Sequence, residues 1–249
     1  MSINSPEQFE KLRTCGMIVG KALRAMAAQV RAGVTTAELC EIGSRVLAEH
    51  GARSSPPMVY GFPGDVCISM NDEVVHGIPG DRVIQPGDLV KLDLTAEKDG
   101  YHTDSAVSIE APPASSNGKA HELAHCAERA FRQALGAARA GNCTKDIGHA
   151  VEREVRRRGF SVVRELGGHG VGRTIHEDPS VPNWSDPEAR DILTEGLVIT
   201  IEPIIAERSG KVWLADDGWT VRTSDGGLSA HYEHTVVITR GQPFLITAA

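Results

Sequence analysis

The sequence predicts an α+β fold in which two similar halves, each made of two helices and a group of short strands, surround a central antiparallel sheet. Three observations support this prediction. Apolar residues recur at helical spacing in four segments, short apolar runs follow each pair of helices, and several letters of the first half recur in the second. The halves cover roughly residues 7–110 and 119–240. We expect them to share one core, so that residues 1–249 form a single domain.

Two helices are predicted at the start of the first half. Residues 6–32 carry apolar side chains at helical spacing, and Pro6 occupies the first turn, where its missing N–H leaves no hydrogen bond unmade. Residues 37–50 form the second helix, because Thr35 and Glu38 are spaced as a capping box at its start. A glycine follows each helix, as is common at helix ends.

Short apolar runs separated by glycine- and proline-containing turns predict strands in the rest of each half. Between 58 and 110 the runs are C-I-S-M, V-V-H, L-V-K-L-D-L and A-V-S-I. A polar connector at 111–118 leads to two more helices, at 119–140 and 144–158. These are followed by F-S-V-V, L-V-I-T-I, K-V-W-L and H-T-V-V-I, so the second half repeats the plan of the first.

The repeat is visible in individual residues as well as in the order of elements. The letters R-A-G at 31–33 recur at 139–141. Aligning G-D-L-V-K-L-D with G-L-V-I-T-I-E places Asp93 over Glu202. A few matching letters arise easily by chance. The matched order of elements nevertheless favours an internal duplication, with the halves packed about a pseudo-two-fold axis.

Composition and charge argue against several classes of function. The net charge of −7 and the isoelectric point of about 5.8 do not suit a nucleic-acid surface, which needs clustered lysine and arginine. The five cysteines include no C-x-x-C pair, which argues against a disulfide framework and a structural zinc site. No apolar run approaches the roughly 18 residues of a membrane span, and the polar first residues are unlike a secretory signal. We therefore expect a cytoplasmic protein that reads no nucleic acid and enters no membrane.

Two aspartates stand in runs that should enter the core. With Asp99-Gly100 as the turn of a hairpin, Thr95 faces Asp104, and Asp93 shares the same face. The two carboxylates become diagonal neighbours, about 7–8 Å apart at the backbone. If their carboxylates approach to about 4 Å, the two like charges repel by about 4 kcal/mol at an effective dielectric constant of 20. Either one aspartate is protonated or a cation lies between them.

The second half supplies a matching pair, Glu202 in V-I-T-I-E and Glu233 in H-Y-E-H-T. If the duplication is real, the pseudo-axis brings all four acids to one place. Four carboxylates carry a charge of −4, which two divalent ions neutralise. Oxygen-rich ligation suits manganese, iron(II), cobalt or magnesium better than a thiolate-type zinc site. One imidazole would complete such a centre, and residues 167–179 offer two: His169, which lies between glycines that let the backbone come close, and His176.

Each of these residues, taken alone, has a plainer explanation. An isolated Asp93 is more often a turn or capping residue, a strand glutamate such as Glu202 usually faces solvent, and His76 before Gly-Ile-Pro fits a turn. The glycine-rich run around His169 lacks the Lys-Ser/Thr of a phosphate-binding loop. Four strand carboxylates repeated in order, with a glycine-flanked histidine between them, are better explained by a metal centre.

Together these motifs resemble the type I methionine aminopeptidases, which have the pita-bread metallopeptidase fold. The resemblance extends from about residue 7 to the end of the chain. It rests on V-C-I-S-M-N-D-E-V-V-H-G-I-P, L-V-K-L-D-L through T-D-S-A, G-H-G-V-G-R-x-x-H-E-x-P, I-T-I-E-P and S-A-H-Y-E-H-T. It implies the same fold here, and it implies five dimetal ligands: Asp93, Asp104, His169, Glu202 and Glu233.

The resemblance also implies how the site acts. Two divalent ions, such as cobalt, manganese or iron(II), would hold a water molecule that attacks the first peptide bond. Glu202 would carry the proton from this water to the leaving amine, His176 would donate to the carbonyl oxygen, and His76 would contact the scissile amide. The implied lining of the methionine pocket is Tyr60, Phe62, Cys67, Ile175 and Trp219.

The implied substrates are the N-termini of nascent polypeptides whose second residue is small. A transient ribosome contact is expected by analogy alone, and we expect a monomer. Pro56, Tyr60 and Ile175 stand where many bacterial members have cysteine, histidine and an aromatic residue, which puts the shape of the pocket in question. Three alternatives stay open: an X-Pro peptidase on the same fold, a paralogue with another residue preference, and a non-catalytic binding paralogue.

Overall fold

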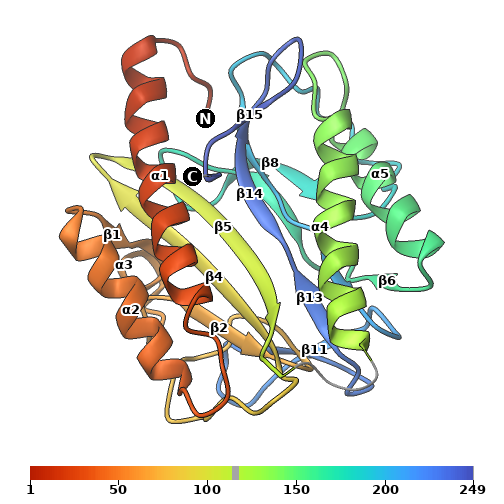
Figure 1. Cartoon of the computed structure of the whole chain (residues 1–249). Helices are drawn as coiled ribbons and strands as arrows, with labels where there is room; N and C mark the ends of the chain where they lie inside the picture. Colours follow the sequence, from red (N-terminus) through yellow and green to blue (C-terminus); the bar gives the residue numbers. More distant parts are fainter. Residues whose placement is uncertain (114–117, 249) are drawn as a thin grey trace.

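The computed structural model describes residues 1–113 and 118–248 (Figure 1). Its helices are α1 (Pro6–Ala27), α2 (Thr36–Glu49), α3 (Ser55–Tyr60), α4 (Lys119–Ala137) and α5 (Thr144–Arg157). Its strands are β1 (Arg53–Ser54), β2 (Cys67–Met70), β3 (Glu73–Val75), β4 (Leu89–Lys98), β5 (Tyr101–Glu110), β6 (Ser161–Val162), β7 (Gly167–Gly170), β8 (Glu177–Pro182), β9 (Val198–Ile201), β10 (Ile204–Ala206), β11 (Val212–Leu214), β12 (Val221–Thr223), β13 (Ser229–His231), β14 (Glu233–Val237) and β15 (Phe244–Leu245).

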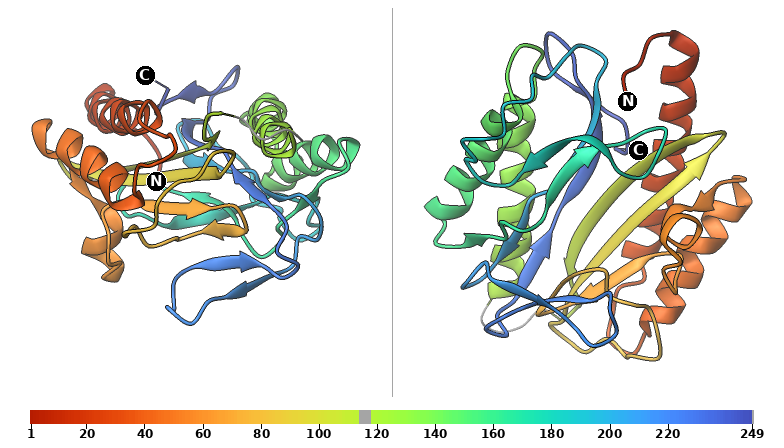
Figure 2. Two further views of the ribbon diagram at one scale, coloured as in Figure 1. Left: turned by 60° about the horizontal axis from the view of Figure 1, so that its bottom comes forward. Right: turned by 180° about the vertical axis from the view of Figure 1, so that it is seen from behind.

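The main sheet has the order β1-β4-β5-β14-β9-β7-β8, with β2 also paired to β4 and β15 to β14. At its centre β5, from the first half of the chain, lies antiparallel to β14, from the second half (Figure 1). Two smaller sheets have the orders β13-β10-β6 and β11-β12-β3. The hairpin of β11 and β12 projects on the side away from the long helices (Figure 2).

The long helices α1, α2, α4 and α5 all lie on one face of the main sheet (Figure 2). Strand alternation explains this arrangement. In β4, Leu92 and Leu94 belong to the core beneath α1 and α2, whereas Asp93 and Thr95 line a cavity on the opposite face. In the second half, Ile201 of β9 joins the corresponding core beneath α4 and α5. Asp93 and Thr95 are therefore directed to the helix-free face.

The helix predicted over 6–32 ends earlier than expected, because α1 stops at Ala27. The chain then turns, Val30 enters the core, and the N–H of Gly33 donates to the carbonyl of Ile84. A buried turn needs an apolar residue as much as a helix does, so the apolar pattern alone places the helix end too late. In the second half, α4 and α5 match the predicted helices but also end slightly short, at Ala137 and Arg157.

The capping box predicted before α2 is confirmed. The hydroxyl oxygen of Thr35 accepts from the N–H of Glu38 at 3.1 Å, and the carboxylate of Glu38 accepts from the N–H of Thr35 at 2.7 Å. These bonds satisfy N–H groups that the first helical turn leaves without partners.

Helix α3 is an element that the sequence pattern does not indicate. Pro56 and Pro57 suggest a break in the chain, yet proline fits the first turn of a helix, and Gly61 (φ +72°) ends it. Residues 114–117 of the predicted connector lie outside the described residues. Among the helices described, none combines the length and the apolar character that a membrane crossing requires.

Candidate metal centre

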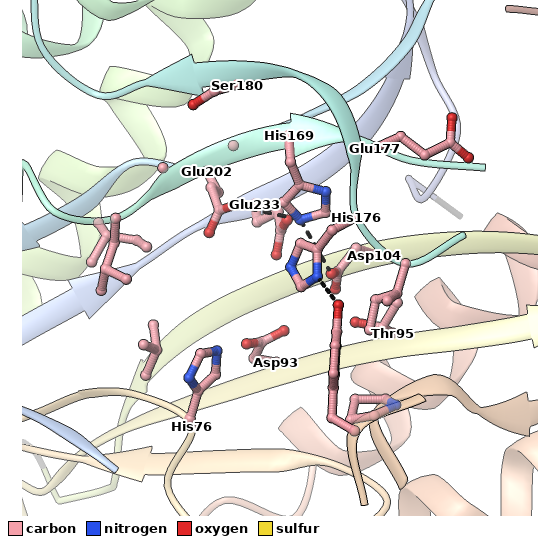
Figure 3. Close-up of a pocket in the computed structure, with 18 of the residues that line it drawn as sticks. His76, Asp93, Thr95, Asp104, His169, His176, Glu177, Ser180, Glu202 and Glu233 are labelled. Atoms are coloured by element: carbon pink, nitrogen blue, oxygen red, sulfur yellow. Dashed lines mark hydrogen bonds and ion pairs between the residues drawn. The ribbon is translucent and has the colours of Figure 1, made fainter. Parts of the chain in front are cut away.

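The hairpin of β4 and β5 has the register that its turn predicts. Asp99 and Gly100 both have positive φ angles, +52° and +80°, as a type I′ turn requires. Thr95 pairs with Asp104, so Asp93 and Asp104 point to the same face of the sheet. Figure 3 shows both carboxylates directed into one pocket. The predicted register is confirmed.

The second half of the chain brings two more acids to this pocket. Glu233 begins β14 and pairs with Ala106 of β5, and Glu202 directly follows β9. Thr235 fixes the adjoining backbone, since its hydroxyl accepts from the N–H of Asp104 at 2.8 Å and donates to the carbonyl of Asp104 at 2.9 Å. The structure therefore brings together all four carboxylates that the sequence singles out (Figure 3).

The glycines beside His169 allow β7 to fit closely between its two neighbouring strands. A Cβ atom on Gly168 would lie 2.4 Å from the carbonyl oxygen of Thr200 on β9. A Cβ atom on Gly170 would lie 2.1 Å from the carbonyl oxygen of Asp178 on β8. Both distances are too short for a side chain, so the glycines are required for the close approach that aims His169 at the acids.

The imidazole of His169 is oriented by its neighbours. Its Nδ1 lies 2.8 Å from the carbonyl oxygen of Gly170, which assigns the ring hydrogen to Nδ1 and leaves the lone pair on Nε2. Nε2 lies 4.0 Å from Oδ2 of Asp104 and 3.8 Å from Oε1 of Glu202. The backbone N–H of His169 donates to the hydroxyl of Thr200 at 3.0 Å, and that hydroxyl lies 3.4 Å from Oε1 of Glu202.

The acids carry unfavourable charge in this buried place. Burial first, and then the charges of Asp104 and Glu202, raise the pKa of Asp93 and of Glu233 well above the usual range. Burial raises the pKa of Glu202 to about 8, although the nearby His169 opposes the shift. Oδ1 of Asp104 and Oε1 of Glu233 are buried and have no hydrogen-bond partner among the described residues. Such a cluster is stabilised by cations.

The donor atoms fit divalent metal ions. Asp104, His169 and Glu233 offer ligand atoms that all lie within 4.8 Å of one another. The unpaired carboxylate oxygens and the exposed lone pair of His169 Nε2 form an oxygen-rich set with imidazole nitrogen, which suits manganese, iron(II) or cobalt.

A second group of the same kind contains a residue that sequence reasoning missed. Glu202, His231 and Glu233 also offer ligand atoms within 4.8 Å of one another. Nε2 of His231 lies 3.2 Å from Oε2 of Glu202 and 3.6 Å from Oε2 of Glu233. The alternation of strand side chains could have found it, because His231 stands two residues before Glu233 and shares its face.

The acids and His169 lie in the wall of a cavity of about 500 Å³. Most of the residues predicted to bind substrate also line it: His76, His176, Tyr60, Phe62, Ile175 and Trp219. Cys67 does not line the cavity. It is buried in β2, where it pairs with Asp93 of β4. Residues that pair directly in an antiparallel ladder project to the same face, so the side chain of Cys67 lies on the face that carries Asp93.

His76 and His176 approach the acids from different sides. His76 follows β3 and has a positive φ of +58°, and Figure 3 places it across the cavity from His169. The ring of His176 packs edge-on against that of His169, with centroids 4.2 Å apart. Loss of contact with water, followed by the neighbouring His169, lowers the pKa of His176 to about 4. The metal-free site therefore holds His176 as a neutral ring at neutral pH.

Apolar groups form the other wall of the cavity. Phe62 and Trp219 meet edge-to-face with ring centroids 5.3 Å apart, and Ile175 is buried beside the cavity. Tyr60 also faces the cavity, but it is 47% exposed and its hydroxyl contacts His176. An apolar wall next to a cluster of acids is the arrangement expected where an uncharged side chain is held beside reacting polar groups.

Comparisons with known proteins agree with this geometry. Residues 10–240 match metallopeptidase family M24. Methionine aminopeptidase 2 of Bacillus subtilis is 40% identical over 249 residues, which is 99% of each chain. The methionine aminopeptidase of Clostridium perfringens is 39% identical over 245 residues, or 98% of each chain.

Solved structures show the same fold. The methionine aminopeptidase of Thermotoga maritima superposes with a TM-score of 0.95 and 31% identity over 100% of both chains. The prolidase of Pyrococcus furiosus, at 24% identity, shares the fold with a TM-score of 0.79 over 99% of this chain and 65% of its own. The predicted pita-bread fold is thereby confirmed. The chain belongs to metallopeptidase family M24, in the branch whose named members are methionine aminopeptidases.

Proposed function

We propose that the protein is a methionine aminopeptidase that removes the N-terminal methionine from polypeptides whose second residue is small. One observation carries the proposal: four strand carboxylates and His169 converge in the wall of a cavity whose other wall is apolar. The names of relatives at about 40% identity over nearly the full chain point to the same activity. Membership of the metallopeptidase family implies the use of divalent metal.

We further propose a two-ion centre. Four carboxylates supply a charge of −4, so two divalent ions such as cobalt, manganese or iron(II) would neutralise it. The proposed ligands are Asp93, Asp104, His169, Glu202 and Glu233. When bound, the ions would supply an activated water molecule as the nucleophile and a binding point for the free α-amine of the substrate.

The chain's own residues would handle the protons and the substrate. Glu202 is the proposed proton carrier between the water and the leaving amine, because it is buried among the ligands and its pKa is raised toward neutrality. His176 would donate a hydrogen bond to the substrate carbonyl as negative charge develops there. His76, from across the cavity, would contact the amide of the bond that is cleaved.

The apolar wall would hold the methionine side chain. Phe62, Trp219 and Ile175 supply aromatic and aliphatic surface, and a thioether gains about 0.3–1.5 kcal/mol from contact with an aromatic ring. Tyr60 would close the open side of this pocket. Cys67, on the same face of the sheet as Asp93, would form the buried end of this pocket.

Nascent polypeptides, a transient ribosome contact, a monomeric state and a cytoplasmic location belong to the same proposal. The five cysteines, all within the described residues, are free thiols, which is consistent with a reducing compartment. Membrane and nucleic-acid partners are not part of the proposal, in keeping with the acidic net charge.

Peptide cleavage by metal-loaded protein tests this function. We expect cleavage of Met-Ala-Ser, with little cleavage of Leu-Ala-Ser or Ala-Pro-Ser, and loss of activity when the metal is chelated. Preferential cleavage of Ala-Pro-Ser would establish the X-Pro alternative. Preference for Leu-Ala-Ser would indicate a paralogue with another residue preference. If no peptide is cleaved, the protein is the non-catalytic binding paralogue.

A pair of variants tests the proposed role of Glu202. General acid–base catalysis contributes about 10²–10⁴-fold, so Glu202→Gln should lower kcat by at least about 10²-fold while the protein stays folded. Glu195→Gln is a matched control, because Glu195 is an exposed carboxylate paired with Arg240. Equal activity of both variants would refute the proposed proton carrier.

A further inference from the structure

We propose that His231 is a sixth ligand of the metal centre. It gives the centre a second imidazole nitrogen, on the side of the Glu202 carboxylate that faces away from His169. The inference rests on the metal-dependent function proposed above. It assigns a role to a residue outside the five ligands that the family resemblance implies.

His231 is a polar side chain with no visible reason to be buried. It is 2% exposed, and neither Nδ1 nor Nε2 has a hydrogen-bond partner among the residues that the structure describes. A buried polar group without a partner is costly, so such groups are rare in folded proteins. A metal ion at Nε2 would satisfy one of these two ring nitrogens.

The distances around His231 are those of ligands that share an ion. With a metal–ligand bond of about 2.1 Å, two ligands lie about 3.0 Å apart at a right angle and about 3.4 Å apart at a tetrahedral angle. Nε2 of His231 lies 3.2 Å from Oε2 of Glu202 and 3.6 Å from Oε2 of Glu233. These separations are shorter than the 3.8 and 4.0 Å around Nε2 of His169, a ligand already proposed.

A hydrogen bond does not account for the contact. Nε2 lies close enough to Oε2 of Glu202 for a hydrogen bond, but none forms. The ring nitrogen and the carboxylate oxygen are therefore not aligned for N–H donation. Ligands of one ion stand beside each other in this manner, because each points at the ion and not at its neighbour.

The two candidate groups form a continuous centre. Asp104, His169 and Glu233 make one group, and Glu202, His231 and Glu233 make the other, so Glu233 belongs to both. Glu202 lies between the histidines, with Oε1 toward His169 and Oε2 toward His231. An added nitrogen donor favours cobalt, nickel or zinc over manganese or magnesium, which prefer oxygen.

The backbone holds His231 in place without using its ring. Its N–H donates to the hydroxyl of Ser108 at 2.9 Å, and that hydroxyl donates to the carbonyl of His231 at 2.8 Å. The residue also pairs with Ile204 of β10. A substitution that keeps the main chain unchanged can therefore remove the imidazole while the strand remains anchored.

Proton NMR of the Co(II)-loaded full-length protein can count the ligating imidazoles, since each ligand contributes its own hyperfine-shifted ring signals. We expect two sets in the natural protein, and one set in both His231→Gln and His169→Gln. Cobalt affinity of His231→Gln, measured by calorimetry, should fall at least about tenfold. His234→Gln is the matched control, because His234 stands in the adjoining strand β14 and its Nδ1 lies 2.8 Å from the hydroxyl oxygen of Thr247. It should keep both sets.

One set of imidazole signals in the natural protein would overturn the proposal, and this count does not depend on how any variant folds. Unchanged cobalt affinity in a folded His231→Gln would also overturn it. The two proposals can fail separately. If the protein shows two imidazole ligands but does not cleave Met-Ala-Ser, His231 is a ligand and the proposed function is wrong. If the protein cleaves the peptide but shows a single imidazole ligand, the proposed function holds and His231 is not a ligand.

Discussion

The hydroxyl oxygen of Tyr60 lies 2.5 Å from Nδ1 of His176, and the two rings are tilted by 40° with centroids 5.6 Å apart. With the phenol donating, the neutral His176 carries its hydrogen on Nε2. The low pKa of His176, about 4, keeps the ring in that neutral form. Tyr60 would thus orient the histidine that is proposed to bind the substrate carbonyl.

Removing this hydroxyl should slow catalysis. A hydrogen bond of about 0.5–1.5 kcal/mol corresponds to a roughly 2- to 13-fold change in rate, so we expect Tyr60→Phe to lower kcat for Met-Ala-Ser by that factor. The metal content should not change, because Tyr60 is not a proposed ligand. Tyr101→Phe is the control, since its hydroxyl bonds to Arg173. A Tyr60→Phe enzyme with the kcat of the natural protein would exclude the orienting role.

Metal binding should release protons near neutral pH. The pKa values of Asp93, Glu202 and Glu233 are raised in the metal-free protein, that of Glu202 to about 8. Below these values the folded protein holds protons that a cation must displace. The apparent affinity should therefore rise with pH through the range in which these groups ionise, by about tenfold per pH unit for each proton released.

Calorimetry in buffers of different ionisation enthalpy measures this proton release directly. We expect release between pH 6 and 8, and less release from Glu202→Gln, which has lost one of the titrating groups. Metal affinity that stays constant over this range would show that the acids are already ionised before the metal binds.

Two glycine substitutions should have opposite effects on stability. Gly170→Ala places a Cβ atom 2.1 Å from the backbone oxygen of Asp178, and overpacking of this kind costs about 1–3 kcal/mol in the free energy of unfolding. It should also weaken metal binding, because His169 is the adjacent residue. Gly136→Ala, in α4 with open space around it, should stabilise by about 0.5–1 kcal/mol. Urea unfolding of both variants checks the signs, and a stable Gly170→Ala would contradict the close approach.

Local patterns in the sequence were sufficient wherever local chemistry decides the structure. The Asp99-Gly100 turn fixes the hairpin register, and Thr35 with Glu38 fixes the start of α2. Helix ends were harder, because Val30 has the same apolar character in a buried turn as in a helix. The internal duplication stays a prediction, supported by the similar order of elements in the two halves.

Charge and strand alternation predict those site residues that lie within one hairpin. Asp93 and Asp104 follow from one hairpin, whereas the position of His169 depends on packing between β8 and β9 that the sequence does not reveal. His231 was missed because Glu233, two residues later, already explained the motif. Cys67 stays a predicted pocket residue, since its pairing with Asp93 places both side chains on the same face of the sheet. Contacts between distant segments cannot be obtained from spacing alone.

Thr200 links a histidine and an acid of the proposed centre, and its removal should weaken metal binding. Its hydroxyl accepts from the N–H of His169 at 3.0 Å and donates to Oε1 of Glu202 at 3.4 Å. Thr200→Val keeps the shape but leaves that N–H without its partner, at a cost of about 1–3 kcal/mol in the free energy of unfolding. Groups that orient metal ligands typically contribute about 10–100-fold in affinity, and we expect a loss of that size by calorimetry.

The matched control for this change is Thr103→Val. Thr103 is equally buried, but its hydroxyl donates to the sulfur of Cys15 on the helix side of the sheet. That variant should lose stability and keep its metal affinity. If both variants bind metal as the natural protein does, the hydroxyl of Thr200 stabilises the strand without orienting the ligands. A loss in Thr200→Val alone shows that orientation of His169 and Glu202 sets the affinity.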